Sequence, residues 1–106
     1  TGDDVWGTRA RWTVLTGRIL NEPVAVAVFD HPENPGHPTY WHARGYGLFA
    51  ANPLGQRVFS NGKEELRLTL EPKQSVTFKY RVLILSGETT TDKIEDQYRR
   101  FIAEVR

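Results

Sequence analysis

Apolar and polar side chains alternate along much of this chain, and a period of two residues is the signature of a β-strand. Residues 65–71 read ELRLTLE, which puts Leu66, Leu68 and Leu70 on one face. Residues 75–85 repeat the alternation, with an apolar face made of Val76, Phe78, Tyr80, Val82 and Ile84. The intervening PKQ is a turn signal. The pattern predicts a hairpin, one side of which faces water.

Two further segments predict a second hairpin. Residues 11–20, RWTVLTGRIL, and residues 24–29, VAVAVF, are separated by the turn signal NEP at residues 21–23. The VAVAVF run is apolar on both faces, as expected of a central strand that is covered on two sides. Residues 40–44 and 47–51 predict two short strands, or one strand bent at a glycine, and NPLG at residues 52–55 predicts a turn.

The chain is expected to end in a helix. Three threonines at residues 89–91 offer helix N-caps, and acidic residues follow them in the first turns. One stripe at helical spacing consists of Ile94, Tyr98, Phe101 and Val105. Glu95–Arg99 and Asp96–Arg100 are favourable pairs four residues apart. We therefore predict a mainly β fold, either an antiparallel β-sandwich or a twisted sheet, with one C-terminal helix packed on it.

The overall composition restricts the class of protein. The 106 residues suffice for a single domain, 1–106, and 14 basic against 13 acidic residues argue against nucleic acid as the main partner. No apolar run reaches the length of a membrane span, and without cysteine there is no disulfide or thiolate chemistry. The chain has no methionine and begins TGDDVWG, so we interpret it as the C-terminal part of a longer protein. Exposed strand edges would favour homo-oligomers.

The chemistry of the chain is concentrated in residues 29–53. This quarter of the sequence contains all three histidines and four of the six prolines. Pro32, Pro35 and Pro38 each restrict their own backbone and that of the preceding residue, which makes the polar loop stiff. We expect such a loop, placed after a buried strand, to present a functional site.

One interpretation of this segment is acid–base catalysis. His42 and His37 are the candidate proton acceptors or donors, and Asp30, at the end of the VAVAVF strand, is the candidate carboxylate partner. The alternative is that Trp41 belongs to the core, that His42 lies on the surface of a strand and that Arg44 forms a salt bridge. The pattern of residues leaves both open, and with them the question of whether the protein is an enzyme.

A second interpretation is ligand binding. Aromatic faces beside a few polar groups are typical of a pocket for a small molecule or a glycan. The candidate ligand-binding residues are Trp41, Arg44, Tyr46 and Asn52. Trp41 or Tyr46 would stack on a sugar ring, and Arg44 and Asn52 would hold hydroxyl or carboxylate groups. The alternative is a non-catalytic structural or interaction module with aromatic residues in its core.

A third interpretation is metal binding. His31, His37 and His42, with Asp30 and Glu33 nearby, are residue types that hold divalent ions. Their spacing matches no standard ligand motif, and histidines also form hydrogen bonds in rigid loops. We therefore assign no metal ligands and predict no cofactor.

The order of several unusual segments resembles a known family. WGTRARW, the long segment GRILNEPVAVAVFDHPENPGHPTYWHARGYGLFAANPLG and the helix IEDQYRRF are similar to the C-terminal part of a bacterial domain family of unknown function that carries the label methane oxygenase PmoA. The resemblance covers nearly the whole chain. It implies a mainly β protein without membrane spans that is exported, secreted or periplasmic, and directed at carbohydrate. It further implies a sandwich of the galactose mutarotase type, in which a histidine and a carboxylate transfer protons.

Overall fold

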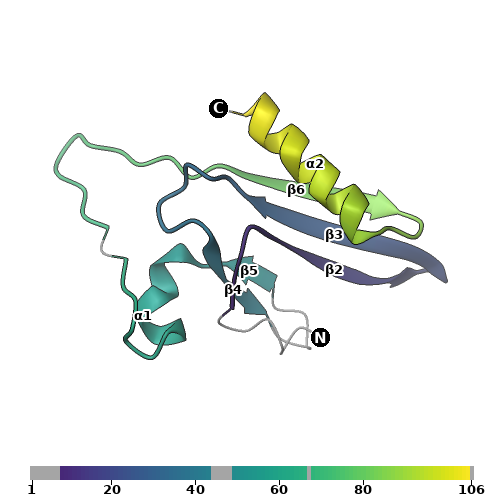
Figure 1. The fold of residues 1–106 in the computed structure, drawn as a ribbon, viewed down its shortest axis with the longest axis horizontal. Helices are drawn as coiled ribbons and strands as arrows, with labels where there is room; N and C mark the ends of the chain where they lie inside the picture. Colours follow the sequence, from purple (N-terminus) through teal and green to yellow (C-terminus); the bar gives the residue numbers. More distant parts are fainter. Residues whose placement is uncertain (1–7, 44–48, 67, 106) are drawn as a thin grey trace.

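A computed structural model describes residues 8–43, 49–66 and 68–105 as two antiparallel sheets and a C-terminal helix (Figure 1). The strands are β1 (Thr8–Ala10), β2 (Trp12–Ile19), β3 (Glu22–Asp30), β4 (Thr39–Ala43), β5 (Phe49–Ala51) and β6 (Tyr80–Ser86). The helices are the 3-10 helix η2 (Pro53–Gly55), the short α1 (Gln56–Phe59) and α2 (Thr91–Glu104). Strand order is β1-β4-β5 in one sheet and β2-β3-β6 in the other. The predicted mainly β class with one C-terminal helix is confirmed.

Strands β2 and β3 form the predicted hairpin. Their register runs from Trp12 opposite Phe29 to Ile19 opposite Glu22. The turn consists of Leu20 and Asn21, whose φ angles of 50° and 66° give the left-handed turn that suits the twist of a two-stranded ribbon. The turn is thus earlier than the predicted residues 21–23, because residues 22 and 23 already belong to β3.

Helix α2 packs against one face of the β2-β3-β6 sheet (Figure 1). The face is formed by alternate residues of the central strand, and Ala27 and Phe29 are fully buried there. The ring of Tyr98 meets the ring of Phe29 edge to face, with centroids 5.7 Å apart. Ile94, Tyr98 and Phe101 are each about 1 % exposed, which confirms the predicted helical stripe.

The predicted N-cap of α2 and one of its two predicted ion pairs are present in the structure. Thr90 is the N-cap, and its side chain accepts a hydrogen bond from the backbone of Lys93. The Asp96–Arg100 pair forms at 3.4 Å. Glu95 does not pair with Arg99 as predicted. Its carboxylate instead lies at the start of β2, 2.9 Å from Arg11, the residue before the strand, and 2.6 Å from the indole nitrogen of Trp12.

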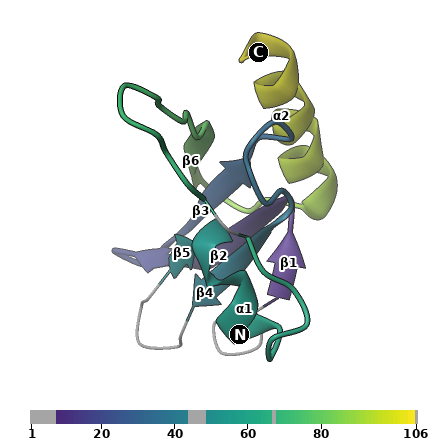
Figure 2. The same cartoon turned by 90° about the vertical axis from the view of Figure 1, so that its left-hand side faces the viewer.

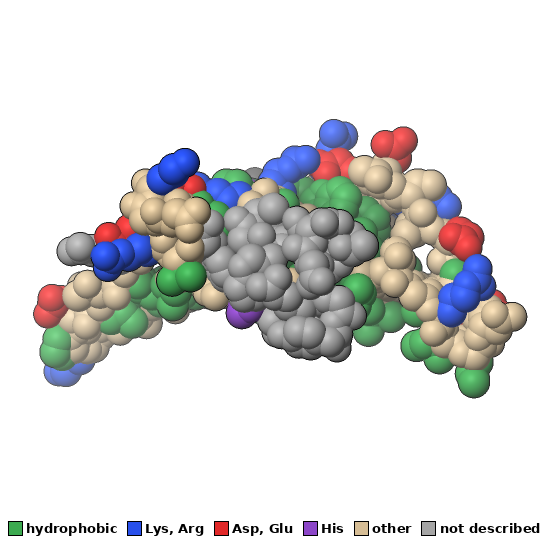
Figure 3. Space-filling view, turned by 90° about the horizontal axis from the view of Figure 1, so that it is seen from below, with side chains coloured by type: hydrophobic (Ala, Val, Ile, Leu, Met, Phe, Trp, Pro, Cys, Tyr) green, Lys and Arg blue, Asp and Glu red, His purple; other side chains and the backbone are tan. Residues whose placement is uncertain are grey.

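The opposite face of the same sheet is apolar and exposed. Leu15 is 47 % exposed, Val82 62 % and Ile84 74 %. Ile84 lies opposite Val26 of the central strand, and Val82 opposite Val28. The prediction that both faces of the central strand are covered is therefore wrong for this face. In Figure 3, hydrophobic side chains reach the surface on both sides of the grey residues.

The predicted hairpin of residues 65–85 does not form among the described residues, because β6 pairs with β3 and not with residues 65–71. Residues 75–79 and the described residues of 65–71 belong to no strand, and they extend as an open arm before β6 (Figures 1 and 2). The turn does form, since the Gln74 backbone donates to the Glu71 carbonyl over 3.0 Å. Lys73 has a φ of 70° behind Pro72, as in a type II turn, which splays the strands of a hairpin.

The register that this turn imposes is a second reason why the two segments do not pair. A two-residue turn at Pro72 and Lys73 would place Leu70 opposite Ser75 and Leu68 opposite Thr77. The leucines and the apolar residues of 76–80 would then lie on opposite faces, so neither face of the ladder would be apolar throughout. Alternation within each segment cannot reveal this mismatch.

The smaller sheet matches the two short strands that were predicted. Strands β4 and β5 pair from Trp41 opposite Ala51 to Ala43 opposite Phe49. The predicted turn at residues 52–55 is the helix η2, which continues directly into α1, an element that was not predicted. The sheet and these helices together position residues 30–39, which connect the two sheets.

Candidate functional site

The carboxylate of Asp30 is the centre of a buried polar network. Strand β3 ends at Asp30, whose side chain is 1 % exposed. One carboxylate oxygen lies 2.6 Å from Nδ1 of His37 and 3.1 Å from the backbone nitrogen of Thr39. The other lies 2.7 Å from the amide nitrogen of Asn34. Three donors from one proline-braced loop thus satisfy a carboxylate that burial alone would destabilise.

His37 is oriented by this carboxylate and is partly exposed. Because a carboxylate accepts hydrogen bonds, the Asp30 contact places a proton on Nδ1 of His37. No described residue forms a hydrogen bond with the other ring nitrogen, Nε2, and 16 % of the side chain is exposed. An imidazole held by a carboxylate at one nitrogen and open at the other can accept or donate a proton at that open nitrogen.

Asn34 donates to the Asp30 carboxylate and is itself held by the backbone of Lys79, a role that the sequence analysis did not predict. Its amide nitrogen donates to the Lys79 carbonyl over 2.7 Å, and its amide oxygen accepts from the Lys79 backbone over 2.6 Å. The side chain therefore pairs with the backbone just before β6 as a further strand residue would. It is 4 % exposed, and no local signal in an Asn-Pro dipeptide separates this role from a turn former.

The three histidines do not converge. His31 is 2 % exposed, its Nε2 contacts the carbonyl oxygen of Val105 at the end of α2, and its Nδ1 accepts a hydrogen bond from the backbone of Glu33. His42 is half-buried on β4, between the buried Trp41 and Ala43. The described residues contain no group of three or more histidine and carboxylate side chains that could hold a metal ion.

The candidate ligand-binding residues occupy different environments. Trp41 is fully buried, donates its indole N–H to the carbonyl oxygen of Ala10 over 2.9 Å and packs on Phe49. Its ring is therefore buried, in agreement with the alternative prediction that Trp41 belongs to the core. Asn52 is half-buried immediately before η2, and its side chain does not cap that helix. Arg44 and Tyr46 lie outside the described residues.

Two tyrosines lie near Asp30, and both have a raised pKa. Tyr98 donates its hydroxyl to the backbone carbonyl oxygen of Asp30 over 2.9 Å. Burial, with the negative charge of Asp30 second, raises the pKa of Tyr98 to about 12. The same two causes in the same order raise the pKa of Tyr80, which lies opposite Asp30 on β6. Both hydroxyls therefore stay neutral at physiological pH.

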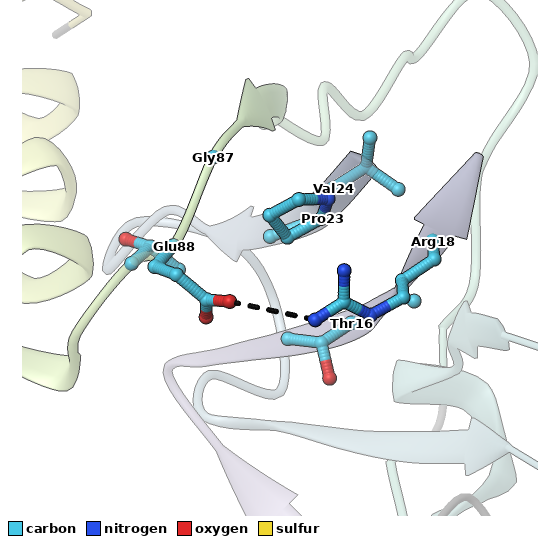
Figure 4. Close-up of a pocket in the computed structure, with 9 residues that line it drawn as sticks. Thr16, Arg18, Pro23, Val24, Gly87 and Glu88 are labelled. Atoms are coloured by element: carbon cyan, nitrogen blue, oxygen red, sulfur yellow. Dashed lines mark ion pairs between the residues drawn. The ribbon is translucent and has the colours of Figure 1, made fainter. Parts of the chain in front are cut away.

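Two surface hollows that are lined by described residues lie away from Asp30 and His37. One, of about 280 Å³, is lined by residues 16–18 of β2, residues 23–25 of β3 and residues 87–89 (Figure 4). Arg18 and Glu88 face each other across it at 3.9 Å, with side chains 59 % and 83 % exposed. A second hollow, of about 260 Å³, shares Glu88 and Thr89. Neither hollow is lined by a histidine, and the opposite charges of Arg18 and Glu88 in the first offset each other. The Asp30–His37 pair is therefore the stronger candidate for proton transfer.

Comparison with known proteins gives the family. The model of a family described as "Family of unknown function (DUF6807)" matches residues 1–99. The chain belongs to this family. A search of curated proteins and a search of solved structures each found no match. Within the described residues, no helix is long and apolar enough to cross a bilayer.

Proposed function

We propose that this member of a family of unknown function carries a proton-transfer site for a small hydroxylated ligand, with a sugar ring as the favoured class. One observation carries the proposal. Nδ1 of His37 lies 2.6 Å from the buried carboxylate of Asp30, while no described residue occupies Nε2. Groups held in this way are suited to general acid–base catalysis.

The proposed roles follow from the contacts. His37 takes a proton from a ligand hydroxyl at Nε2, Asp30 stabilises the imidazolium that forms, and the imidazolium then returns this proton to the ligand. Asn34 and the backbone of Thr39 hold the carboxylate so that it meets the ring in one orientation. Of the two histidines that the sequence proposed, the geometry favours His37, because the Asp30 carboxylate is hydrogen-bonded to that ring.

The ligand contacts belong to the same proposal. Asn52 and Arg44 would hold hydroxyl or carboxylate groups, and Tyr46 would supply the stacking face. We assign no stacking to Trp41, because its ring is fully buried. A sugar-binding sheet of the galactose mutarotase type and an exported protein, secreted or periplasmic, are the further expectations of this proposal.

Interconversion of sugar anomers is the simplest test, because it requires proton transfer and no cofactor. Freshly dissolved α-D-galactose and α-D-glucose are mixed with the protein, optical rotation is followed over time, and binding is measured by saturation-transfer NMR. Wild type should bind a sugar and accelerate the change in rotation. His37→Gln should lower that acceleration by roughly a hundredfold, as expected for loss of a general base, while binding persists.

His42→Gln is the matched comparison. It makes the same chemical change at the histidine that the Asp30 carboxylate does not hold, and it should retain most of the acceleration. A protein that neither binds nor interconverts these sugars would overturn the proposal. So would a His37→Gln protein as active as wild type.

A further inference from the structure

Arg9 contacts the backbone on both sides of His37. Its Nε donates to the carbonyl oxygen of Pro38 over 2.9 Å, and one terminal nitrogen donates to the carbonyl oxygen of Gly36 over 3.2 Å. The two acceptors belong to the residues immediately before and after His37. A single guanidinium thus bridges the carbonyl groups of the two residues that flank His37.

The guanidinium is itself fixed from two directions. Its remaining nitrogen lies 2.5 Å from a carboxylate oxygen of Glu64, and its central carbon lies 5.2 Å from the ring centroid of Tyr40. The Tyr40 hydroxyl donates to the other oxygen of Glu64. That hydrogen bond, followed by burial, raises the pKa of Tyr40, so the hydroxyl keeps the proton it donates.

The placement follows from the register of the smaller sheet. Arg9 lies opposite Tyr40 where β1 pairs with β4, so the two side chains share a face. Glu64 is brought to the same place by Ser60, whose hydroxyl accepts from the Glu64 backbone over 2.7 Å. All three guanidinium nitrogens are therefore engaged, two by backbone carbonyls of residues 36–38 and one by the Glu64 carboxylate.

We infer that Arg9 is a positioning residue for His37, which holds the loop so that Nδ1 meets the Asp30 carboxylate. The catalytic purpose of this positioning rests on the proposed function. The effect of Arg9 on the geometry of the loop can be tested whether or not that function holds. The planar fork of arginine supplies donors in several fixed directions, whereas the lysine ammonium is a compact point charge. Arg9→Lys therefore keeps the charge and removes the bridge.

The test is nitrogen-15 NMR of the His37 ring in the intact chain. In wild type, the Nδ1 proton should be visible as a resonance protected by the Asp30 carboxylate. In Arg9→Lys, its exchange with water should accelerate by at least tenfold. In sugar interconversion, kcat should fall by a similar factor while KM stays within twofold. Arg9→Gln serves as the second variant should the lysine protein fail to fold.

Arg81→Lys is the matched control. Arg81 also pairs with a carboxylate, at 2.8 Å from Glu104, lies 5.2 Å from the centroid of the Phe101 ring and has a side chain 30 % exposed, as Arg9 has. It touches neither carbonyl beside His37, so its lysine variant should leave the Nδ1 resonance unchanged.

The outcomes separate the two proposals. An unchanged His37 resonance in folded Arg9 variants would overturn the positioning role, even if the protein interconverts sugars. Equal loss of the resonance in Arg81→Lys would also overturn it, because the effect would then be one of general stability. A wild-type protein inactive on sugars, whose Nδ1 proton still depends on Arg9, would refute the proposed function alone.

Discussion

The Tyr98 hydroxyl donates a hydrogen bond to the backbone carbonyl oxygen of Asp30 over 2.9 Å. Tyr98 belongs to the buried stripe of α2, and Asp30 is the residue whose carboxylate holds His37. Asp30 therefore connects the main core, through its backbone carbonyl, with the candidate site, through its carboxylate. Changes in the packing of α2 should be detectable at His37.

This contact predicts how stability depends on alkaline pH. The pKa of Tyr98 is about 12 in the folded protein, against about 10 in an unfolded chain. The contribution of the neutral hydroxyl is therefore complete below about pH 10 and is lost as pH rises through about 12. The difference corresponds to roughly 2–3 kcal/mol of unfolding free energy.

Tyr98→Phe should lose about 1 kcal/mol at neutral pH and then decline less steeply than wild type between pH 10 and 12. Urea unfolding at several pH values measures both effects. Tyr80→Phe is the comparison, because Tyr80 is 38 % exposed and should alter the alkaline slope less. If the unfolding free energies of wild type and Tyr98→Phe decline in parallel between pH 10 and 12, the alkaline loss of stability does not come from Tyr98.

Asn34→Asp should destabilise the loop that holds His37. The new carboxylate would place an oxygen where the amide nitrogen now donates to Asp30 and to the Lys79 carbonyl. Unsatisfied buried groups and facing carboxylates should cost on the order of 3 kcal/mol in urea unfolding.

Asn61→Asp makes the same change on the surface, where Asn61 is exposed, and should stay within about 0.5 kcal/mol of wild type. Similar losses for the two variants would show that Asn34 does not form the bridge.

The two faces of the β2-β3-β6 sheet should respond differently to substitution. Ile84→Ser changes a residue that is 74 % exposed and should alter the unfolding free energy by no more than about 0.5 kcal/mol. Phe101→Ala removes a buried ring of α2 that packs on the other face of the sheet, and it should cost about 3–5 kcal/mol. Comparable losses, or a loss at Ile84 that grows with protein concentration, would mean that the apolar face is covered in solution.

Local patterns predicted the elements whose partners are close in the sequence. The β2-β3 hairpin needs only two alternating segments and a short turn, and α2 needs only a cap and a stripe at helical spacing. The strand at residues 65–71 has the same local signal and does not form. Whether it pairs depends on the turn at Pro72 and Lys73 and on register, which alternation does not encode.

The candidate site shows the same limit. The sequence predicted a site in the loop after β3 and left His37 and His42 equivalent. Asp30 holds His37 because the path of residues 31–39 brings Thr39 and His37 back to the strand end. Trp41 was a stacking candidate by composition, yet its ring packs on Phe49, donates to the Ala10 carbonyl and is fully buried. The positions of these side chains depend on contacts between distant parts of the chain, which residue type alone does not predict.

The central claim is that the Asp30 carboxylate holds the proton of His37 on Nδ1 and leaves Nε2 for a ligand. Long-range proton–nitrogen NMR of the His37 ring, in wild type and in Asp30→Asn, measures this directly at neutral pH. We predict an Nδ1-bound proton in wild type and loss of that preference in Asp30→Asn, because an amide can donate as well as accept. A wild-type ring that carries its proton on Nε2, or one whose signals do not change in Asp30→Asn, would contradict the account.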